Sequence, residues 1–180
     1  MPRWRVRGSL RQGGERRSVS GLGWFKHQWG FLYSEAIAGW DWFGTQLSNG
    51  LELEVALVFD RQWNVAPGSY AVVIERDGRP TRLDLSLVEV RQTGETWRSP
   101  RTDTVYPTRW VLEIPRRNAY LMLEAVAPAQ EMVVFPANLW AGTLTAEGTF
   151  DGEPVTGDCF AELVGHDAPF GRSLVRSGRR

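Results

Sequence analysis

Hydrophobic and polar residues alternate along several stretches of the chain, and this pattern predicts β-strands. The clearest stretch is Leu51–Phe59, which places five apolar side chains on one face and Glu52 and Glu54 on the other. The same period of two recurs over Thr81–Val90, Arg109–Ile114 and Tyr120–Val126. No stretch has the helical period with comparable strength. The sequence therefore predicts an all-β protein of about ten strands with little helix.

Turn signals lie between these stretches and make the predicted sheet antiparallel. Asn49-Gly50, Asp77-Gly78 and Asp151-Gly152 are dipeptides typical of tight hairpins. Short antiparallel strands joined in this way form a sandwich or an up-and-down barrel, and a barrel removes exposed sheet edges. The chain of 180 residues contains no linker or internal repeat. We expect one β domain over residues 1–165 and a Gly/Ser/Arg-rich tail over residues 166–180.

The charges are unevenly distributed although the formal net charge is zero. Residues 1–17 contain six arginines and one glutamate, and residues 172–180 contain four arginines. The segment between them carries 11 basic and 20 acidic residues, a net charge of −9. A neutral chain with an acidic body does not resemble a protein that holds nucleic acid through phosphate contacts. We expect the arginine-rich ends to be solvated surface.

Several other classes of protein are excluded or disfavoured. No apolar run is long enough to span a membrane, and the first residues have no apolar stretch of a secretory signal, so a cytoplasmic location is expected. The single cysteine, Cys159, and the two histidines cannot build a zinc site rich in those residues. P-loop, dinucleotide-binding, nucleophile-elbow and H-E-x-x-H motifs are all absent. We expect no metal and no cofactor.

Tryptophan is the most unusual residue, with nine copies, and two neighbouring segments concentrate it with polar groups. These segments are 23–30, which contains His27, and 39–47, which contains Asp41. If both are strands, Trp40 and Trp42 point away from Asp41 and Phe43. Flat aromatic walls with a few polar groups suit a long apolar ligand, and histidine is the usual proton shuttle near neutral pH. The alternative is that the indoles fill a small barrel and His27 hydrogen-bonds Asp41 within the core.

These segments resemble the AttH-like family, which includes the carotenoid hydratases. The resemblance rests first on Gly23-Trp24, His27-Gln28-Trp29-Gly30, Gly39-Trp40-Asp41-Trp42-Phe43, Gln46-Leu47 and Asn49-Gly50. It continues in order through Trp97-Arg98-Ser99-Pro100, Tyr106-Pro107-Thr108-Arg109-Trp110, Ile114-Pro115, Gln130-Glu131, Gly148 to Gly157 and Ala161-Glu162-Leu163-Val164-Gly165. The matches correspond to the C-terminal half of the family.

The resemblance implies a lipocalin-like, calycin-type antiparallel β-barrel. Full-length members resemble two such barrels in tandem, so this chain would either enclose a ligand in its one barrel, form a homodimer, or recruit a partner barrel in place of the missing half. The family acts on long hydrophobic polyenes by adding water, and related lipocalin-like proteins act as Diels-Alder-type cyclases in polyketide pathways. The implied functions are therefore cyclisation of a polyene or polyketide in natural-product biosynthesis, hydration of a polyene, or non-catalytic carriage of such a molecule.

Departures from the family pattern favour cyclisation among these functions. Lys26 replaces an acidic residue, Ala141 replaces a glutamate, and His166 stands where the family motif often ends in an aromatic residue. Protonating an isolated alkene needs a strong acid, whereas a cycloaddition needs a shaped apolar cavity and a hydrogen-bond donor. The candidate catalytic residues are His27, Asp41, Gln46, Tyr106 and Glu162. The candidate substrate-binding residues are Trp24, Trp29, Trp40, Trp42, Phe43, Trp110 and Trp140.

Overall fold

A computed structural model describes residues 2–27, 36–134 and 138–166 of the chain. The chain divides into two compact units, Met1–Leu32 and Tyr33–Arg180, and each is described by itself. The expectation of a single domain over residues 1–165 stays a prediction.

The first unit is a two-stranded antiparallel ribbon. Strand β1 (Trp4–Gln12) pairs with β2 (Glu15–Gly23) without a break in register, and Gly13 and Gly14 form the turn with positive φ. The strand expected near residues 23–30 is not seen over the described part, because β2 ends at Gly23 and residues 24–27 are irregular.

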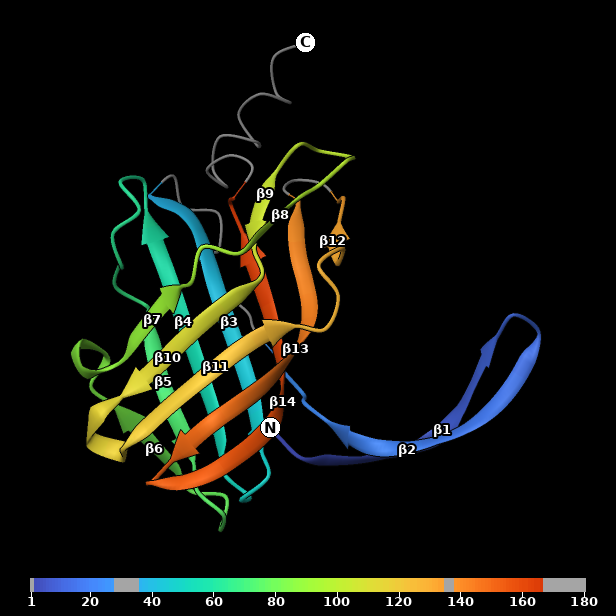
Figure 1. Ribbon diagram of the computed structural model, residues 1–180, viewed down its shortest axis with the longest axis horizontal. Helices are drawn as coiled ribbons and strands as arrows, with labels where there is room; N and C mark the ends of the chain where they lie inside the picture. Colours follow the sequence, from blue (N-terminus) through green and yellow to red (C-terminus); the bar gives the residue numbers. More distant parts are fainter. Residues whose placement is uncertain (1, 28–35, 135–137, 167–180) are drawn as a thin grey trace. The chain divides into compact units, whose positions relative to one another are not determined.

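The second unit contains a curled antiparallel sheet of ten strands (Figure 1). Its strands are β3 (Ile37–Leu47), β4 (Glu52–Asp60), β5 (Tyr70–Ile74), β6 (Pro80–Leu83), β7 (Glu89–Gln92), β10 (Arg109–Ile114), β11 (Ala119–Ala125), β12 (Glu131–Met132), β13 (Leu139–Phe150) and β14 (Glu153–Val164). The order is β6-β5-β4-β3-β14-β13-β11-β10-β7, with β12 paired to β13. A separate antiparallel pair, β8 (Thr96–Arg98) and β9 (Val105–Pro107), lies between β7 and β10 in the sequence.

The two edges of this sheet are consecutive in the sequence. Only residues 84–88 connect β6 to β7, and such a short link spans at most about 20 Å. Within these residues the side chain of Asp84 accepts hydrogen bonds from the backbone and the hydroxyl of Ser86 and caps the 3-10 turn η1 (Leu85–Leu87). The sheet must therefore curl until its edges approach each other, as a barrel does.

Most of the predicted strands are confirmed, and one is wrong in part. The stretches 51–59, 109–114 and 120–126 correspond to β4, β10 and β11, and all three predicted hairpin turns are present. The stretch Thr81–Val90, predicted as one strand, is broken at Asp84 because the cap diverts the chain where the sheet closes. The described residues contain two helical elements, the 3-10 turns η1 and η2 (Pro115–Arg117).

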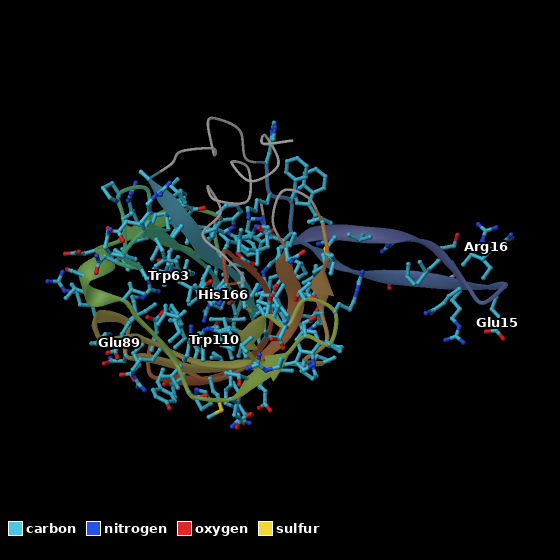
Figure 2. The ribbon with its side chains drawn as sticks, turned by 90° about the horizontal axis from the view of Figure 1, so that it is seen from above. Glu15, Arg16, Trp63, Glu89, Trp110 and His166 are labelled. Atoms are coloured by element: carbon cyan, nitrogen blue, oxygen red, sulfur yellow. The ribbon has the colours of Figure 1, made fainter. Side chains whose placement is uncertain are left out.

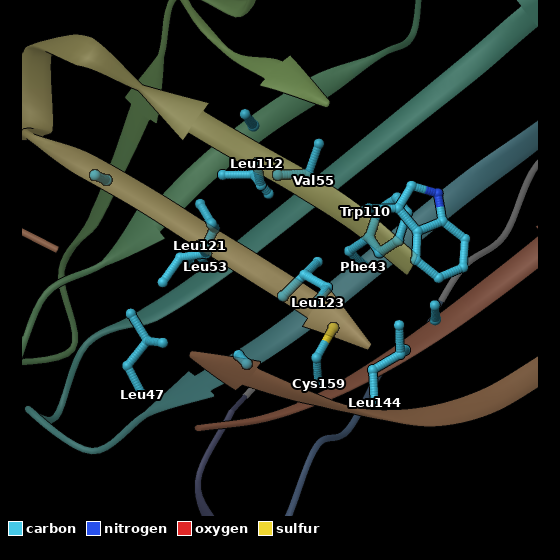
Figure 3. Close-up of a cluster of buried hydrophobic side chains, with 14 of the residues drawn as sticks. Phe43, Leu47, Leu53, Val55, Trp110, Leu112, Leu121, Leu123, Leu144 and Cys159 are labelled. Carbon is cyan, nitrogen blue, oxygen red and sulfur yellow. The ribbon is translucent and has the colours of Figure 1, made fainter. Parts of the chain in front are cut away.

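The inner face of the sheet holds one hydrophobic core (Figure 3). The turn end of β3 and β4 supplies aliphatic side chains such as Leu47 and Leu53, whereas the other end is aromatic, with Phe43, Trp110 and Trp140. Burial of these side chains is the main force that holds the sheet curled. No helix in the described part of the chain is long and apolar enough to cross a membrane.

Candidate functional site

A buried carboxylate and an imidazole pair at the aromatic end of the barrel. Asp41 lies on β3, two residues before Phe43 and on the same inward face. Its Oδ1 lies 2.9 Å from Nε2 of His166, and the side chains of Asp41 and His166 are 6% and 10% exposed. The contact uses Nε2 of the imidazole, so Nδ1 of His166 is left for a second partner.

The backbone after β14 turns His166 toward Asp41. Gly165 has φ +92°, and a Cβ at this position would lie 2.3 Å from the carbonyl oxygen of Ala38. A side chain at residue 165 would therefore collide with β3. Glycine alone fits this close approach in this conformation, and the chain can then leave the alternating pattern of the strand.

Aromatic rings surround His166. Trp63 approaches the imidazole edge-on with ring centroids 5.6 Å apart, and Tyr106 lies 5.8 Å away on a tilted plane. Trp97 stacks on Tyr106 at 6.2 Å. Figure 2 shows His166 and Trp110 within the ring of strands seen from above. The proton-carrying pair is therefore embedded in aromatic surface, which is suited to an apolar ligand.

A second polar network holds Tyr106 in place. The Glu131 carboxylate accepts hydrogen bonds from Ser99 (2.5 Å), Thr102 (2.5 Å) and the Tyr106 hydroxyl (3.0 Å). Burial by itself would raise the pKa of Glu131, but the three hydroxyl donors outweigh it and hold this pKa below its usual range. The Tyr106 hydroxyl donates its proton to the ionised Glu131 carboxylate. This hydrogen bond fixes the orientation of the Tyr106 ring beside His166.

Trp110 is buried in the core beside Phe43, the next inward-facing residue of β3 after Asp41. Its ring meets that of Phe43 at 5.4 Å and that of Trp140 at 6.4 Å. The Trp140 indole N–H donates to the carbonyl of Pro128 (2.8 Å), but Nε1 of Trp110 is buried with no hydrogen-bond partner. An unsatisfied buried donor is costly, and this N–H is one of three buried side-chain polar atoms without a hydrogen-bond partner among the described residues.

The sequence-predicted residues fall in three places. Asp41, Tyr106, Phe43, Trp110 and Trp140 face the barrel interior. The outer face of the sheet carries Trp40, Trp42, Gln46 and Glu162. The first unit contains Trp24 and the exposed His27, and Trp29 lies outside the described residues.

The alternation predicted for β3 is confirmed, because Trp40 and Trp42 oppose Asp41 and Phe43. On the outer face, the Trp42 indole donates to Glu54 at 2.9 Å, and Tyr70 donates to the same carboxylate at 2.6 Å. Asp41 and the indoles of Trp40 and Trp42 therefore lie on opposite faces of β3, and the substrate-binding roles suggested for Trp40 and Trp42 stay predictions. The catalytic roles suggested for Gln46, Glu162 and His27 stay predictions.

Four residues of the site were missed: His166, Trp63, Trp97 and Glu131. The predicted C-terminal tail begins at His166, although this residue hydrogen-bonds Asp41, which is 125 positions away in the chain. The signal that could have found it is the glycine that directly follows the alternating run of β14. No such local signal marks Trp63, because its position depends on the fold of the loop after β4.

Other features of the described residues carry no comparable chemistry. The described part of the chain has no group of three or more metal-ligating side chains. An open hollow lined by Glu75, Arg76, Asp77 and Asp151 lies near the hairpin turns at the aliphatic end of the barrel. Its mixed charges do not suit an apolar ligand.

Comparisons with known proteins agree with this architecture. A model of the AttH-like family matches residues 1–166. The chain is similar to the crystal structure of an AttH protein from Nitrosomonas europaea, with a TM-score of 0.72 and 24% identity over 92% of this chain and 51% of that one. It is also similar to kievitone hydratase from Nectria haematococca, with a TM-score of 0.74 and 22% identity over 88% of this chain and 49% of that one.

The chain thus spans about half the length of these two solved proteins. A comparison with curated proteins finds no match. The all-β, lipocalin-like barrel fold expected from the sequence is confirmed by the structure and by these likenesses.

Proposed function

This chain belongs to the AttH-like family, and we propose that it is a small-molecule enzyme of the hydratase type, in which His166 and Asp41 transfer the proton. The observation that carries this proposal is the His166–Asp41 pair itself, buried at the aromatic end of the barrel. Burying two ionisable groups costs several kcal/mol that a hydrophobic pair of similar volume would not cost. Such a pair in a site lined by aromatic rings is typical of general acid–base catalysis.

In this proposal Nε2 of His166 carries the hydrogen of the bond to Asp41, so Nδ1 has the free lone pair. Nδ1 of His166 removes a proton from water while the water oxygen forms a bond to one carbon of the substrate double bond. The π electrons of that bond move to a conjugated carbonyl oxygen and give an enolate. The imidazolium then returns the proton to the neighbouring carbon, so the net reaction is addition of water and His166 is regenerated.

Because imidazolium is a weak acid, the double bond of the substrate must be conjugated with a carbonyl group. An imidazolium is too weak an acid to protonate an isolated alkene, but it can protonate an enolate. The unpartnered N–H of Trp110 supports this substrate class, because it is a donor suited to the developing negative charge on oxygen. The substrate we propose is therefore an apolar, aromatic or polyene molecule with an α,β-unsaturated carbonyl group.

Cyclisation of a polyene or polyketide, predicted from the sequence, stays a prediction. Carriage without chemistry is the main competitor of hydration, since a carrier would use the same aromatic surface. The two differ in one respect: a carrier has no need of a buried proton-transfer pair.

The experiment uses benzylideneacetone, an aryl enone, as the probe in water enriched in 18O. We expect the protein to form the β-hydroxy ketone with solvent oxygen at the β-carbon, detected by mass spectrometry after back-exchange of the carbonyl oxygen. General acid–base groups contribute about 10²- to 10⁴-fold, so His166→Gln is expected to lower the rate by at least about 100-fold. Binding, followed by quenching of tryptophan fluorescence, should change little in this variant.

The chain offers one comparison variant, His27→Gln, at its other histidine. Loss of turnover in His27→Gln with retention in His166→Gln would transfer the catalytic role to His27 and refute the proposed site. Binding of the probe without any product would favour a carrier. Absence of binding would refute the proposed substrate class.

A further inference from the structure

The ribbon formed by β1 and β2 has one apolar and one basic face. Directly paired residues of an antiparallel ribbon lie on the same face, so the register assigns every side chain. The apolar face carries Trp4, Val6, Leu10 and Val19, which are 43% to 55% exposed, and toward the turn it also carries Gln12, Glu15 and Arg17. The opposite face carries Arg5, Arg7, Arg11 and Arg16, with Leu22 beside Arg5.

A ribbon of this kind needs a surface to pack against. A two-stranded ribbon alone is marginally stable in water, and a row of half-exposed apolar side chains marks an interaction surface. Over residues 4–23 it carries five arginines and one glutamate, a net charge of +4. Its partner should therefore present apolar and acidic side chains together.

The second unit has a surface of that kind, which we call the acidic sheet face: the outward-facing residues of β11, β13 and β14. The register places Met122 beside Glu147, Thr145 beside Asp158 and Thr143 beside Phe160. Tyr120, Met122 and Phe160 are 39% to 45% exposed. None of the outward-facing residues on these three strands is basic. Glu147 and Asp158 form no ion pair with the residues that the structure describes.

We propose that the ribbon of one copy docks on the acidic sheet face of a second copy, in a reciprocal dimer. Its apolar face would cover Met122 and Phe160. Each strand of the ribbon is also an edge, and two-stranded ribbons twist strongly, so the long arginine side chains can reach around to Glu147 and Asp158.

Reciprocal exchange favours a second copy as the partner. Every contact then occurs twice about the two-fold axis, which doubles the area buried by a ribbon of only about twenty residues. A stable interface needs about 1,200–2,000 Å² in total, and two ribbon contacts can supply such an area. This proposal does not rest on the proposed enzymatic function.

The test measures the mass of the full chain by sedimentation velocity and light scattering at 1–100 µM. We expect a dimer whose dissociation constant increases with salt. The variant Arg7→Glu/Arg11→Glu should weaken it by about tenfold or more, and Glu147→Arg/Asp158→Arg should do the same. Combining all four substitutions should restore dimerisation to within about threefold of the wild type. The matched control Arg79→Glu/Arg82→Glu, which reverses two exposed charges elsewhere, should leave the dimer intact.

A wild-type chain that stays monomeric at 100 µM would overturn the proposal, whether or not its ribbon binds to its own barrel. A dimer insensitive to both reversals, or one not restored by the combined variant, would also overturn it. If Arg7→Glu/Arg11→Glu unfolds the ribbon, Glu147→Arg/Asp158→Arg gives an independent reading, because those residues lie on the barrel.

Discussion

Removing the imidazole of His166 should destabilise the fold through Asp41. In His166→Ala the Asp41 side chain, 6% exposed, loses its 2.9 Å hydrogen bond while it stays among aromatic rings. Removing one partner of a buried pair costs about 3–5 kcal/mol. The imidazole is 10% exposed, so water can replace part of the lost bond, and we expect the lower end, about 3 kcal/mol. For a chain of this size the expected fall in Tm is about 6–12 °C.

The assay is urea unfolding at pH 7 followed by tryptophan fluorescence, with the free energy obtained by linear extrapolation. Two further variants distinguish the stability lost through the buried carboxylate from the stability lost through packing. His166→Gln keeps an N–H donor and should cost about 1 kcal/mol. Adding Asp41→Asn to His166→Ala removes the charge and should recover more than half of the loss. A loss below about 0.5 kcal/mol in His166→Ala, or no recovery in the double variant, would refute the assigned pairing.

Three further predictions concern the barrel around the site. In Gly142→Ala the new Cβ would lie 2.4 Å from Cη2 of Trp140, so we expect a loss of about 1–3 kcal/mol in urea unfolding, whereas Gly8→Ala, with nothing within 4 Å, should lose less than about 1 kcal/mol. Equal losses in the two variants would contradict the packing of Trp140 over Gly142. Burial raises the pKa of the Cys159 thiol to about 12, so a chromogenic thiol reagent at pH 8 should react only after unfolding, and rapid labelling of the native protein would show that Cys159 is accessible. The folded-state pKa of Glu131 lies below its unfolded value, so its contribution to stability is present above about pH 4.5 and is lost as the pH falls through the folded pKa. Unfolding free energies measured from pH 3 to pH 6 should therefore fall less steeply with acid in Glu131→Gln than in the wild type, and identical slopes would remove this role of Glu131.

The strands were predictable because alternation is a local property of the sequence. The period of two identified β4, β10 and β11, and it grouped the apolar residues of β4 that face the core. Glu52 was predicted on the face of β4 opposite to the core, but its side chain is buried, with only 3% exposed. The break at Asp84 was missed because a polar residue also fits an alternating strand, and only closure of the sheet makes it a cap.

The site was only partly predictable, because contacts distant in the sequence create it. Asp41 and Trp110 were named from their own segments, but the alternation of β3 could not tell which of its faces would be the interior. The position of His166 depends on the close approach of Gly165 to Ala38. This contact brings the end of β14 against the beginning of β3. The unsatisfied donor of Trp110 is likewise a property of the packed interior and has no counterpart in the sequence.

The central claim is that His166 and Asp41 carry out proton transfer on an apolar small molecule, and incorporation of solvent oxygen tests it most directly. The measurement compares 18O at the β-carbon of the benzylideneacetone product for the wild type and His166→Gln, with probe binding monitored in both. The account predicts incorporation by the wild type and a decrease of at least about 100-fold in the variant, with binding retained. Equal incorporation by the two proteins, or a bound probe that the wild type leaves unchanged, would contradict it.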